Sequence, residues 1–416
     1  MEEIAALERA LRRAAPHTLP QVVRAALTER YGAGEVRLRL ADYAMRSLQD
    51  VESPPWVTEP VPVHDSPQGR AFGAQEPYLA AAGPDGGPMR LHLPVTTRGE
   101  RLGVLSLELP PGTDLRAVLP ELQEVCEALG HEILVAERDT DLYVLARRAT
   151  RLTLAAEMQW QLLPGRSCAR PEFALGAQLE PAYAVFGDSY DWSVSADDLT
   201  LTLANGMGEG IDAALLTNLA VNALRNARRA GLDLAGQAAL ADQAVYAQYR
   251  GRAHVSVLLL RFTFATGEVE AVDAGSPRLW RLRDGAVAAR PFEAQLPLGM
   301  FEDTVYTPEY FTVRPGDRLL FASDGVYDAV SATGERFGER ALARALTATR
   351  LLPPTQVPGA VLRALAGHHG EPALDDDALV VCLDWFGRPD GSVPDASAGD
   401  ASTVDASAPE GPAPVG

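Results

Sequence analysis

Carboxylates that stand beside glycines or at the ends of apolar stretches are the residues of this chain best suited to chemistry. Asp188 lies in FGDSYDW, Asp324 lies in ASDGVYD, and Asp375–Asp377 stand before ALVV. An unpaired charge next to an apolar strand would be costly, although a single aspartate there is most often a turn former. Several such aspartates converging on one point require a cation, and hard oxygen ligands suit Mg²⁺ or Mn²⁺. The pattern therefore predicts a divalent metal site.

A glycine-rich turn follows an apolar stretch in LTLANGMGEGIDAALLTNLAV, which begins at Leu201. Gly206 is the first of three glycines in the turn, and a helical pattern opens at Asp212, whose charge suits a helix N-terminus. A nucleotide-binding loop is disfavoured, because no GK[ST] follows and acidic residues surround the turn. Glycine permits close approach and unusual backbone angles. We therefore expect this turn to bring backbone close to a ligand, with the neutral Asn205 as its first polar side chain.

The elements that must position these residues alternate between strand and helix signals up to Trp385. The strand-like stretches are FALGAQLEPAYAV, SADDLTLTLANG, HVSVLLLRFTF, EVEAVDAGSPRLWRLRDG, DRLLFASDGVYDAV and DDDALVVCLDW. The strongest helical stretch is DAALLTNLAVNALRNARRAG. This order predicts an α+β fold, with a two-sheet β-sandwich flanked by helices over residues 164–386.

Residues 1–112 predict a separate α+β unit. IAALERALRRAA and TLPQVVRAALTERYG are helical patterns, EVRLRLADY alternates like a strand, and SPQGRAFGAQEPYL gives a short helix. PMRLHLPVTTRGERLGVLSLELP predicts a β-hairpin that turns at Gly99. This order resembles a GAF-type sensor domain, which implies a regulatory role and a small-molecule ligand or partner. The alternative is a generic α+β domain without a ligand.

Residues 113–163 predict a helical connector with a heptad pattern of apolar residues. The first stretch of the pattern comprises Leu115, Leu119, Leu122, Cys126, Leu129 and Ile133, and a second comprises Leu145, Ala149, Leu152 and Ala156. Such a pattern is typical of a helix that joins two chains in a parallel homodimer. The alternative is that each half packs on its own domain.

The composition of the chain disfavours several classes of partner and cellular location. The chain has 416 residues with a formal net charge of −19, so nucleic acid and anionic membranes are poor partners. Its three cysteines are far apart and form no CxxC pair, which favours a reducing cytoplasm. No apolar run approaches the roughly 18 residues of a membrane span. Residues 387–416 are rich in Ala, Ser, Pro, Gly and Asp, which predicts a disordered acidic tail.

The ordered set of motifs resembles the metal-dependent protein phosphatases of the PPM superfamily, type 2C, in the bacterial SpoIIE branch. The matching phrases are MQWQLLPG, LEPAYAVFGDSYDW, NGMGEGIDAALL, VDAGSPRLWRL, LPLGMF, RPGDRLLFASDGVYDA and DDDALVVCLDW. The resemblance implies a dinuclear Mn²⁺ or Mg²⁺ centre between two β-sheets. It also implies hydrolysis of phosphoserine or phosphothreonine on a regulatory protein, such as an anti-sigma-factor antagonist.

Carried over by position, the resemblance assigns Asp188, Asp324 and Asp376 as metal-binding acids, with the register of Asp376 uncertain by one residue. It also places the Gly206 carbonyl toward a metal. Asn205 stands where the family has a bridging aspartate. An amide oxygen can coordinate, but it is neutral and a poor bridge between two dications.

Two further positions depart from the family pattern, with Ser276 in place of a histidine and Phe186 in place of a glycine. The leading hypothesis is an active phosphatase controlled by the N-terminal domain. Because of Asn205, the alternative is a non-catalytic signalling module with the same fold that binds a partner.

Overall fold

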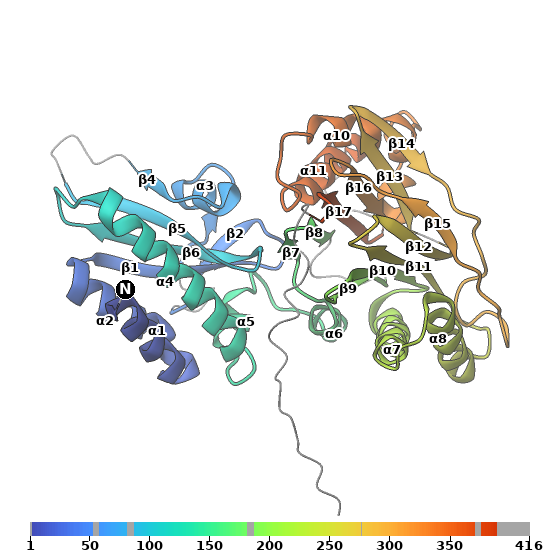
Figure 1. Ribbon diagram of the computed structural model, residues 1–416, viewed down its shortest axis with the longest axis horizontal. Coiled ribbons are helices and arrows are strands. Elements are labelled where there is room, and N and C mark those ends of the chain that lie inside the picture. The colour runs from blue at the N-terminus through green and yellow to red at the C-terminus, as the bar shows by residue number, and fades with distance from the viewer. Residues whose placement is uncertain are drawn as a thin grey trace, which may run out of the picture.

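The computed structural model describes residues 2–52, 58–80, 87–180, 187–275, 277–370 and 376–388. Phe186, Ser276, Asp375 and the predicted tail from residue 389 onward lie outside these ranges. Within them, the strands form three antiparallel sheets, one in the N-terminal part and two in the C-terminal part (Figure 1). No helix in the described ranges is long and apolar enough to cross a membrane.

The N-terminal sheet has the strand order β3-β2-β1-β6-β5-β4. Its strands are β1 (Gly34–Ala41), β2 (Ser47–Asp50), β3 (Val61–Pro62), β4 (Tyr78–Ala80), β5 (Met89–Thr97) and β6 (Glu100–Leu109). The accompanying helices are α1 (Glu2–Arg13), η1 (Pro16–Thr18), α2 (Leu19–Tyr31), α3 (Pro67–Ala74), α4 (Leu115–Ala136) and α5 (Leu142–Ala146). The predicted hairpin is β5–β6, and Gly99 at its turn has a positive φ of 88°.

The heptad pattern of the predicted connector is used within the chain. Leu122, Leu129 and Ile133 on α4 are completely buried in the core that α4 shares with α1, α2 and the first sheet. The second stretch does not continue the helix, because α5 ends at Ala146 and the next helix begins at Leu154. The prediction that these side chains join two chains is therefore wrong. The alternative prediction, that this half of the pattern packs against its own domain, is confirmed. The physical reason is that the apolar face of the first sheet must be buried, and the apolar side chains of α4 cover it.

The C-terminal part is a sandwich of two facing sheets, as the sequence predicts. One sheet has the order β15-β12-β11-β10-β9 and the other β14-β13-β16-β17-β8-β7. The first contains β9 (Asp188–Val194), β10 (Asp198–Gly206), β11 (Val255–Thr263), β12 (Glu268–Ala274) and β15 (Glu309–Thr312). The second contains β7 (Ser167–Arg170), β8 (Phe173–Glu180), β13 (Arg278–Arg283), β14 (Ala286–Arg290), β16 (Arg318–Ala322) and β17 (Ala378–Trp385).

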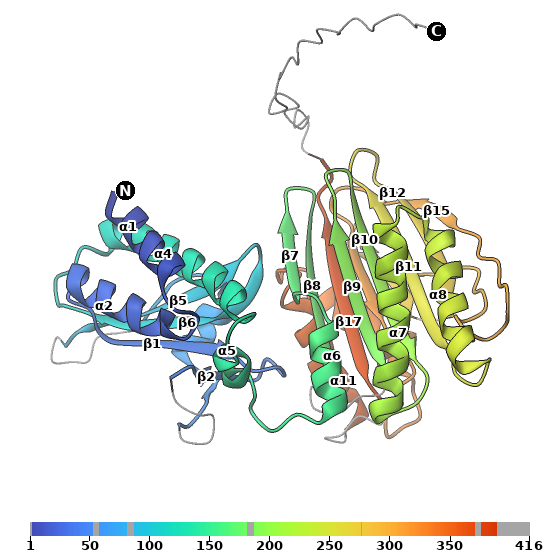
Figure 2. The same ribbon diagram turned by 90° about the horizontal axis from the view of Figure 1, so that it is seen from below.

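Helices cover the outer faces of both sheets (Figure 2). On the β9–β12 sheet lie α7 (Gly210–Arg229) and α8 (Leu234–Tyr249), with α6 (Leu154–Leu162) against α7. On the other sheet lie α9 (Asp324–Tyr327), η2 (Phe337–Ala341), α10 (Leu342–Ala348) and α11 (Val357–His369). The fold class is therefore α+β, and the predicted helix-flanked sandwich is confirmed.

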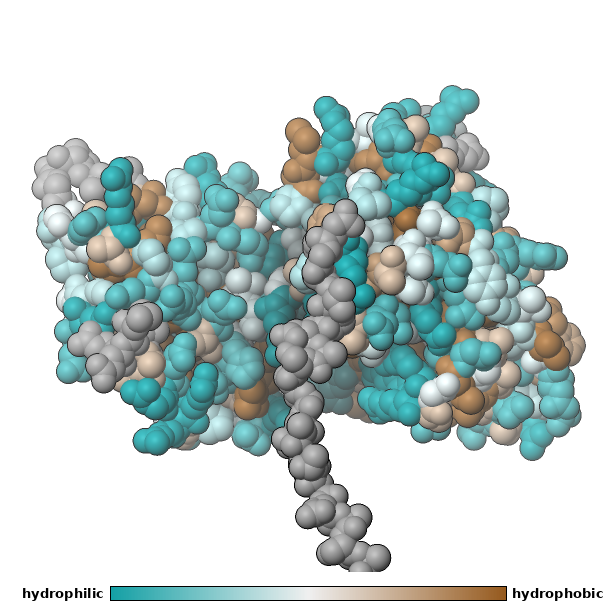
Figure 3. All heavy atoms as spheres, in the orientation of Figure 1, coloured by the Kyte–Doolittle hydropathy of each residue, from teal (hydrophilic) through white to brown (hydrophobic). Residues whose placement is uncertain are grey.

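Strand β10 shows why the sandwich needs helices outside. Leu199, Leu201 and Leu203 point between the two sheets, while the alternate Ala204 joins the core beneath α7. Successive side chains of a strand point to opposite faces, so β10, whose residues 199–204 are all buried, must be covered on both faces. The outer surface is then left mainly hydrophilic, as Figure 3 shows for one face.

A candidate metal centre between the two sheets

The first part of the candidate site comes from two paired strands. Asp188 begins β9 and lies directly opposite Asn205, near the end of β10. The Gly206 amide donates to the Gly187 carbonyl over 3.0 Å. A Cβ built on Gly187 would lie 1.9 Å from the Gly206 oxygen, so only glycine fits there. The turn at Gly206 therefore packs closely against Gly187, while the expected approach of its backbone to a ligand stays a prediction.

The second part comes from the other sheet. Asp324 begins α9, directly after β16, and Asp376 and Asp377 precede the neighbouring strand β17. A Cβ on Gly325 would lie 2.0 Å from the Asp377 carbonyl oxygen, so glycine at this position lets α9 rest on the segment before β17. The Ser323 hydroxyl accepts from the Leu379 amide over 3.0 Å, which ties the two segments together.

Two hydrogen bonds link these parts across the sandwich. The side-chain amide of Asn205 donates to Oδ1 of Asp324 over 2.6 Å, and the backbone amide of Asp188 donates to Oδ2 of Asp377 over 3.2 Å. Asp376 Oδ1 accepts from the Asp377 amide over 2.8 Å. The structure thus brings all the predicted site residues to one end of the sandwich. Their roles as metal ligands stay predictions.

The electrostatics of the site favour a cation. Asp188 and Asp377 are only 2% and 1% exposed. Burial raises the pKa of Asp188 well above its usual value, and Asp377, Asp324 and Asp376 add to the rise. The Ser323 hydroxyl opposes part of it. Burial also raises the pKa of Asp376, with Asp324 contributing. Negative charges that lie close together in a desolvated site disfavour ionisation of the carboxyl groups. A bound dication would favour ionisation and lower their pKa values.

The oxygen atoms of these residues are of the kind that binds a hard cation, but the side chains are not arranged as a complete set of ligands. Both carboxylate oxygens of Asp188 are buried, and neither makes a hydrogen bond to the described residues. Such oxygens are the donors that Mg²⁺ and Mn²⁺ prefer. However, no group of three or more His, Cys, Asp or Glu side chains in the described ranges is arranged to hold a metal. Asn205, bonded to Asp324, occupies the position where the resemblance implies a bridging carboxylate.

Two contacts of the site were not predicted from the sequence. Asp377 is buried whereas Asp376 is only partly buried, although the resemblance assigned Asp376 as the metal-binding acid. Gln159 on α6 donates from Nε2 to the Asp188 carbonyl over 3.0 Å. Gln159 lies in the quoted phrase MQWQLLPG, but only the packing of α6 shows what it contacts.

Comparison with protein families decides how this arrangement is classified. Residues 195–386 match the family model described as Stage II sporulation protein E (SpoIIE). This part of the chain belongs to the SpoIIE family. The match includes Asn205, Asp324 and Asp376. We call residues 154–386, which add α6 and strands β7, β8 and β9 to the matched part, the SpoIIE domain.

Individual relatives of the SpoIIE domain are distant. Protein IcfG of Synechocystis sp. (strain ATCC 27184 / PCC 6803 / Kazusa) is 24% identical over 253 residues, which cover 54% of this chain and 40% of that protein. The chain thus spans less than half the length of this curated relative.

Two solved structures are similar to the SpoIIE domain. One holds the PP2C phosphatase domain and a fragment of the regulatory domain of SpoIIE from Bacillus subtilis, with 17% identity, coverage of 52% of this chain and 64% of that one, and a TM-score of 0.46. The other is the SiaA-PP2C domain of Pseudomonas aeruginosa, with 22% identity, coverage of 56% and 93%, and a TM-score of 0.46.

Proposed function

We propose that the SpoIIE domain removes phosphate from phosphoserine or phosphothreonine on a regulatory protein, with Mn²⁺ or Mg²⁺ held by Asp188, Asp324 and Asp376. The observation that supports this proposal is the buried, uncompensated carboxylate of Asp188, which faces the other acids between the sheets. An anti-sigma-factor antagonist is the class of substrate that we infer from the family resemblance, and the cytoplasm is the compartment.

In this proposal the chain holds charge and geometry in place. Divalent ions would supply the positive charge that draws the phosphoryl oxygens in and activates a water for direct attack on phosphorus. Asp188 is fixed by its strand, by Gln159 at its carbonyl and by Asp377 at its amide. Burial of these groups excludes bulk water, which strengthens every charge interaction inside the site.

A second candidate function rests on the hydrogen bond between Asn205 and Asp324. This amide donates a hydrogen bond to the acid cluster without a metal and supplies no bridging charge. The domain would then be a non-catalytic module that binds a phosphoprotein partner and transmits a signal. Both candidate functions use the same site, but only the phosphatase would hydrolyse the phosphate ester.

Control by the N-terminal domain is a further part of the proposal, and direct contacts support it. The Ser167 amide donates to Glu100 Oε2 over 2.7 Å, and Arg101 donates to the Thr355 carbonyl over 2.6 Å. Tyr43 stacks on Trp160 with ring centroids 4.7 Å apart. A change of shape in the first sheet would therefore move α6 and β7 through these contacts.

The deciding experiment is hydrolysis of p-nitrophenyl phosphate and of a phosphoserine peptide, with and without added Mn²⁺. The comparison uses the wild type, Asp324→Ala and the surface variant Asp328→Ala. Metal-dependent turnover that only Asp324→Ala abolishes supports the phosphatase. No turnover by any protein, together with binding of a phosphoprotein, supports the non-catalytic module.

A further inference from the structure

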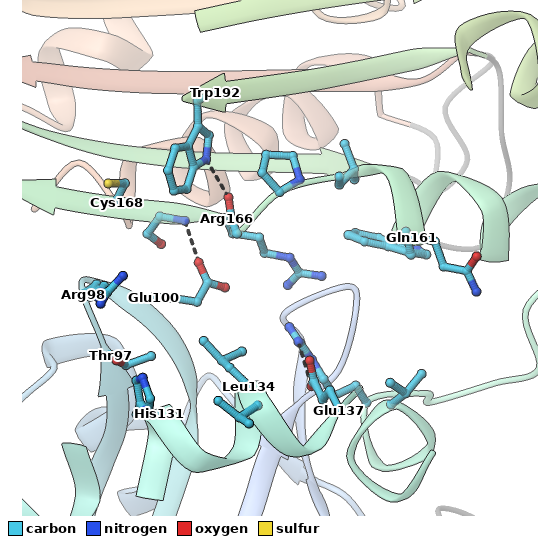
Figure 4. A pocket seen from close by; sticks show the side chains of 18 of the residues that line it. Thr97, Arg98, Glu100, His131, Leu134, Glu137, Gln161, Arg166, Cys168 and Trp192 are labelled. Atoms are coloured by element: carbon cyan, nitrogen blue, oxygen red, sulfur yellow. Dashed lines mark hydrogen bonds and ion pairs between the residues drawn. The ribbon is translucent and has the colours of Figure 1, made fainter. Parts of the chain in front are cut away.

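A large cleft separates the N-terminal domain from the SpoIIE domain, and it lies apart from the candidate metal centre. Its volume is about 1270 Å³. One wall consists of α4 and the β5–β6 turn, and the other of α6, β7 and the end of β9 (Figure 4). Asp188 begins β9 and Trp192 lines the cleft four residues later, so roughly 13 Å of strand separates the two sites.

Arg166 is the central charged group of the cleft. It extends from the SpoIIE-domain wall toward the opposite wall (Figure 4). The residue is only 6% exposed, and its Nη2 donates to the Tyr43 carbonyl over 2.6 Å. Nη1 is buried and makes no hydrogen bond to the described residues. A buried cation with an unused donor is costly unless an anion joins it.

The acids near Arg166 do not satisfy it by contact. Glu100 uses Oε2 to accept from the Ser167 amide, and Glu137 lies 3.8 Å from Arg147. Burial, followed by the charge of Arg147, lowers the pKa of the Arg166 guanidinium, which indicates that its surroundings do not compensate the charge fully.

More cations stand at the rim. Arg98, Arg138 and Arg170 line the cleft, and in the described part of the chain no carboxylate pairs with them. Of the lining carboxylates, Glu137 and Glu157 pair with Arg147 and Arg148, whereas Glu100 and Asp141 form no ion pair with an arginine of the described residues. In a chain with a net charge of −19, four arginines without a carboxylate in contact around one cleft are unexpected. Guanidinium groups favour carboxylate, sulfonate and phosphate groups, to which they donate in pairs.

The walls also offer flat apolar surfaces. The Arg166 guanidinium lies over the Trp160 ring, 4.7 Å from its centroid. Trp192 lines the same wall and anchors its indole nitrogen on the Gly165 carbonyl over 2.9 Å. Leu134 and Val135 are exposed on the α4 wall. Ligand sites combine such apolar and aromatic walls with a few fixed polar groups.

We propose that this cleft binds a small anion that carries an aromatic ring, with the anionic group on Arg166 and the rim arginines and the ring against Trp192. The ligand contacts both domains, because Arg98 and Arg138 follow elements of the N-terminal domain, whereas Arg166 and Arg170 come from the opposite wall. Binding would therefore bias how the two domains sit against each other. The proposal does not depend on phosphatase activity.

Calorimetric titration of the full chain with 1-anilinonaphthalene-8-sulfonate, in a chelator, tests the proposal without involving phosphate chemistry. The expected result is one saturable site per chain. The neutral ring compound 1-naphthalenemethanol and the ringless anion methanesulfonate should each compete at least about tenfold more weakly than naphthalene-1-sulfonate, because each lacks one half of the recognition. Equal competition by the neutral compound would overturn the assignment to arginine.

Variants locate the site. Arg166→Gln should weaken binding about tenfold or more, and the double rim variant Arg138→Gln/Arg170→Gln about threefold or more. The rim variant touches exposed side chains, so it remains informative if Arg166→Gln fails to fold. Arg229→Gln, an exposed arginine on α7, is the matched control and should bind like the wild type. Affinity unchanged in the rim variant, or several weak sites per chain, would refute the proposal.

Discussion

Asn205 on β10 donates its side-chain amide over 2.6 Å to Asp324, which begins α9 just after β16 of the other sheet. Its strand partner Asp188 is meanwhile buried beside Asp377. This amide thus contacts the acid that follows β16 of the facing sheet, where a carboxylate in place of the amide would repel Asp324. We therefore expect Asn205 to stabilise the acid cluster in the absence of metal.

Asn205→Asp should raise Mn²⁺ affinity and phosphate-ester hydrolysis while lowering the stability of the metal-free protein. The added charge attracts a dication strongly even when screened, by several kcal/mol on the order of Coulomb estimates. Without metal, loss of the hydrogen bond and repulsion by Asp324 should cost about 1–3 kcal/mol. Titration calorimetry with Mn²⁺ and thermal unfolding in a chelator measure the two effects. A wild type that is already fast at micromolar metal, and unchanged by the substitution, would contradict this view of Asn205.

Asp324→Ala should abolish stabilisation by Mn²⁺. A ligand at about 100 times its Kd stabilises the folded state by about 2.7 kcal/mol, and that gain disappears when the site is lost. The matched control is Asp328→Ala, which removes an exposed carboxylate that pairs with Arg336 on the surface. Differential scanning calorimetry should show the metal-dependent shift in the control and the wild type alone. Persistence of the shift in Asp324→Ala would exclude this residue as a ligand.

Asp273→Asn should change how stability depends on pH. Burial raises the pKa of Asp273 from 3.8 to about 6 in the folded protein. A raised folded-state pKa means that this group contributes stability below pH 4, and that the contribution is lost as pH rises through about 6. The neutral variant lacks this loss, and Asn can still accept from the Gly275 amide as Asp273 does. Above pH 6 it should be roughly 1–3 kcal/mol more stable than the wild type.

Denaturant unfolding between pH 4 and pH 8 measures this difference. The control is Asp197→Asn, which changes an exposed turn residue. Parallel pH curves for the wild type and Asp273→Asn would show that burial does not shift this carboxyl.

A fragment that starts near residue 150 should fold cooperatively but melt at a lower temperature than the full chain. Its sandwich core is internal to residues 168–385, so folding does not need the first sheet. Removal of Tyr43, however, uncovers Trp160 and leaves Arg166 without its carbonyl partner. Calorimetry and near-UV circular dichroism check this. A molten or insoluble fragment would mean that the two domains do not fold independently.

Leu129→Ala should destabilise the N-terminal domain by about 2–5 kcal/mol, because the residue is fully buried in its core. Its effect should appear in unfolding experiments and not in the molar mass. Light scattering before and after the substitution separates the two, and a dimer that dissociates with intact folding would restore the intermolecular helix. Exposed Leu145→Ala serves as the control.

The sequence by itself determined the elements and most of the candidate site. The period-two pattern of Leu199, Leu201 and Leu203 encodes a strand with one apolar face, and turn glycines mark where the acids follow. These signals are local, since a strand, a hairpin turn or a helix start depends on neighbours within a few residues. The aspartates could therefore be named before the fold was known.

Only the tertiary structure decided which groups touch. The bond between Asn205 and Asp324, the burial of Asp377, and the contact of Gln159 with Asp188 all join residues from different elements. The heptad pattern on α4 could equally serve a partner chain or the chain's own sheet, and only packing chose the latter. The cleft around Arg166 forms from two domains far apart in sequence. An apolar or charged pattern shows that a surface needs a partner, whereas the identity of the partner depends on three-dimensional proximity that no local pattern encodes.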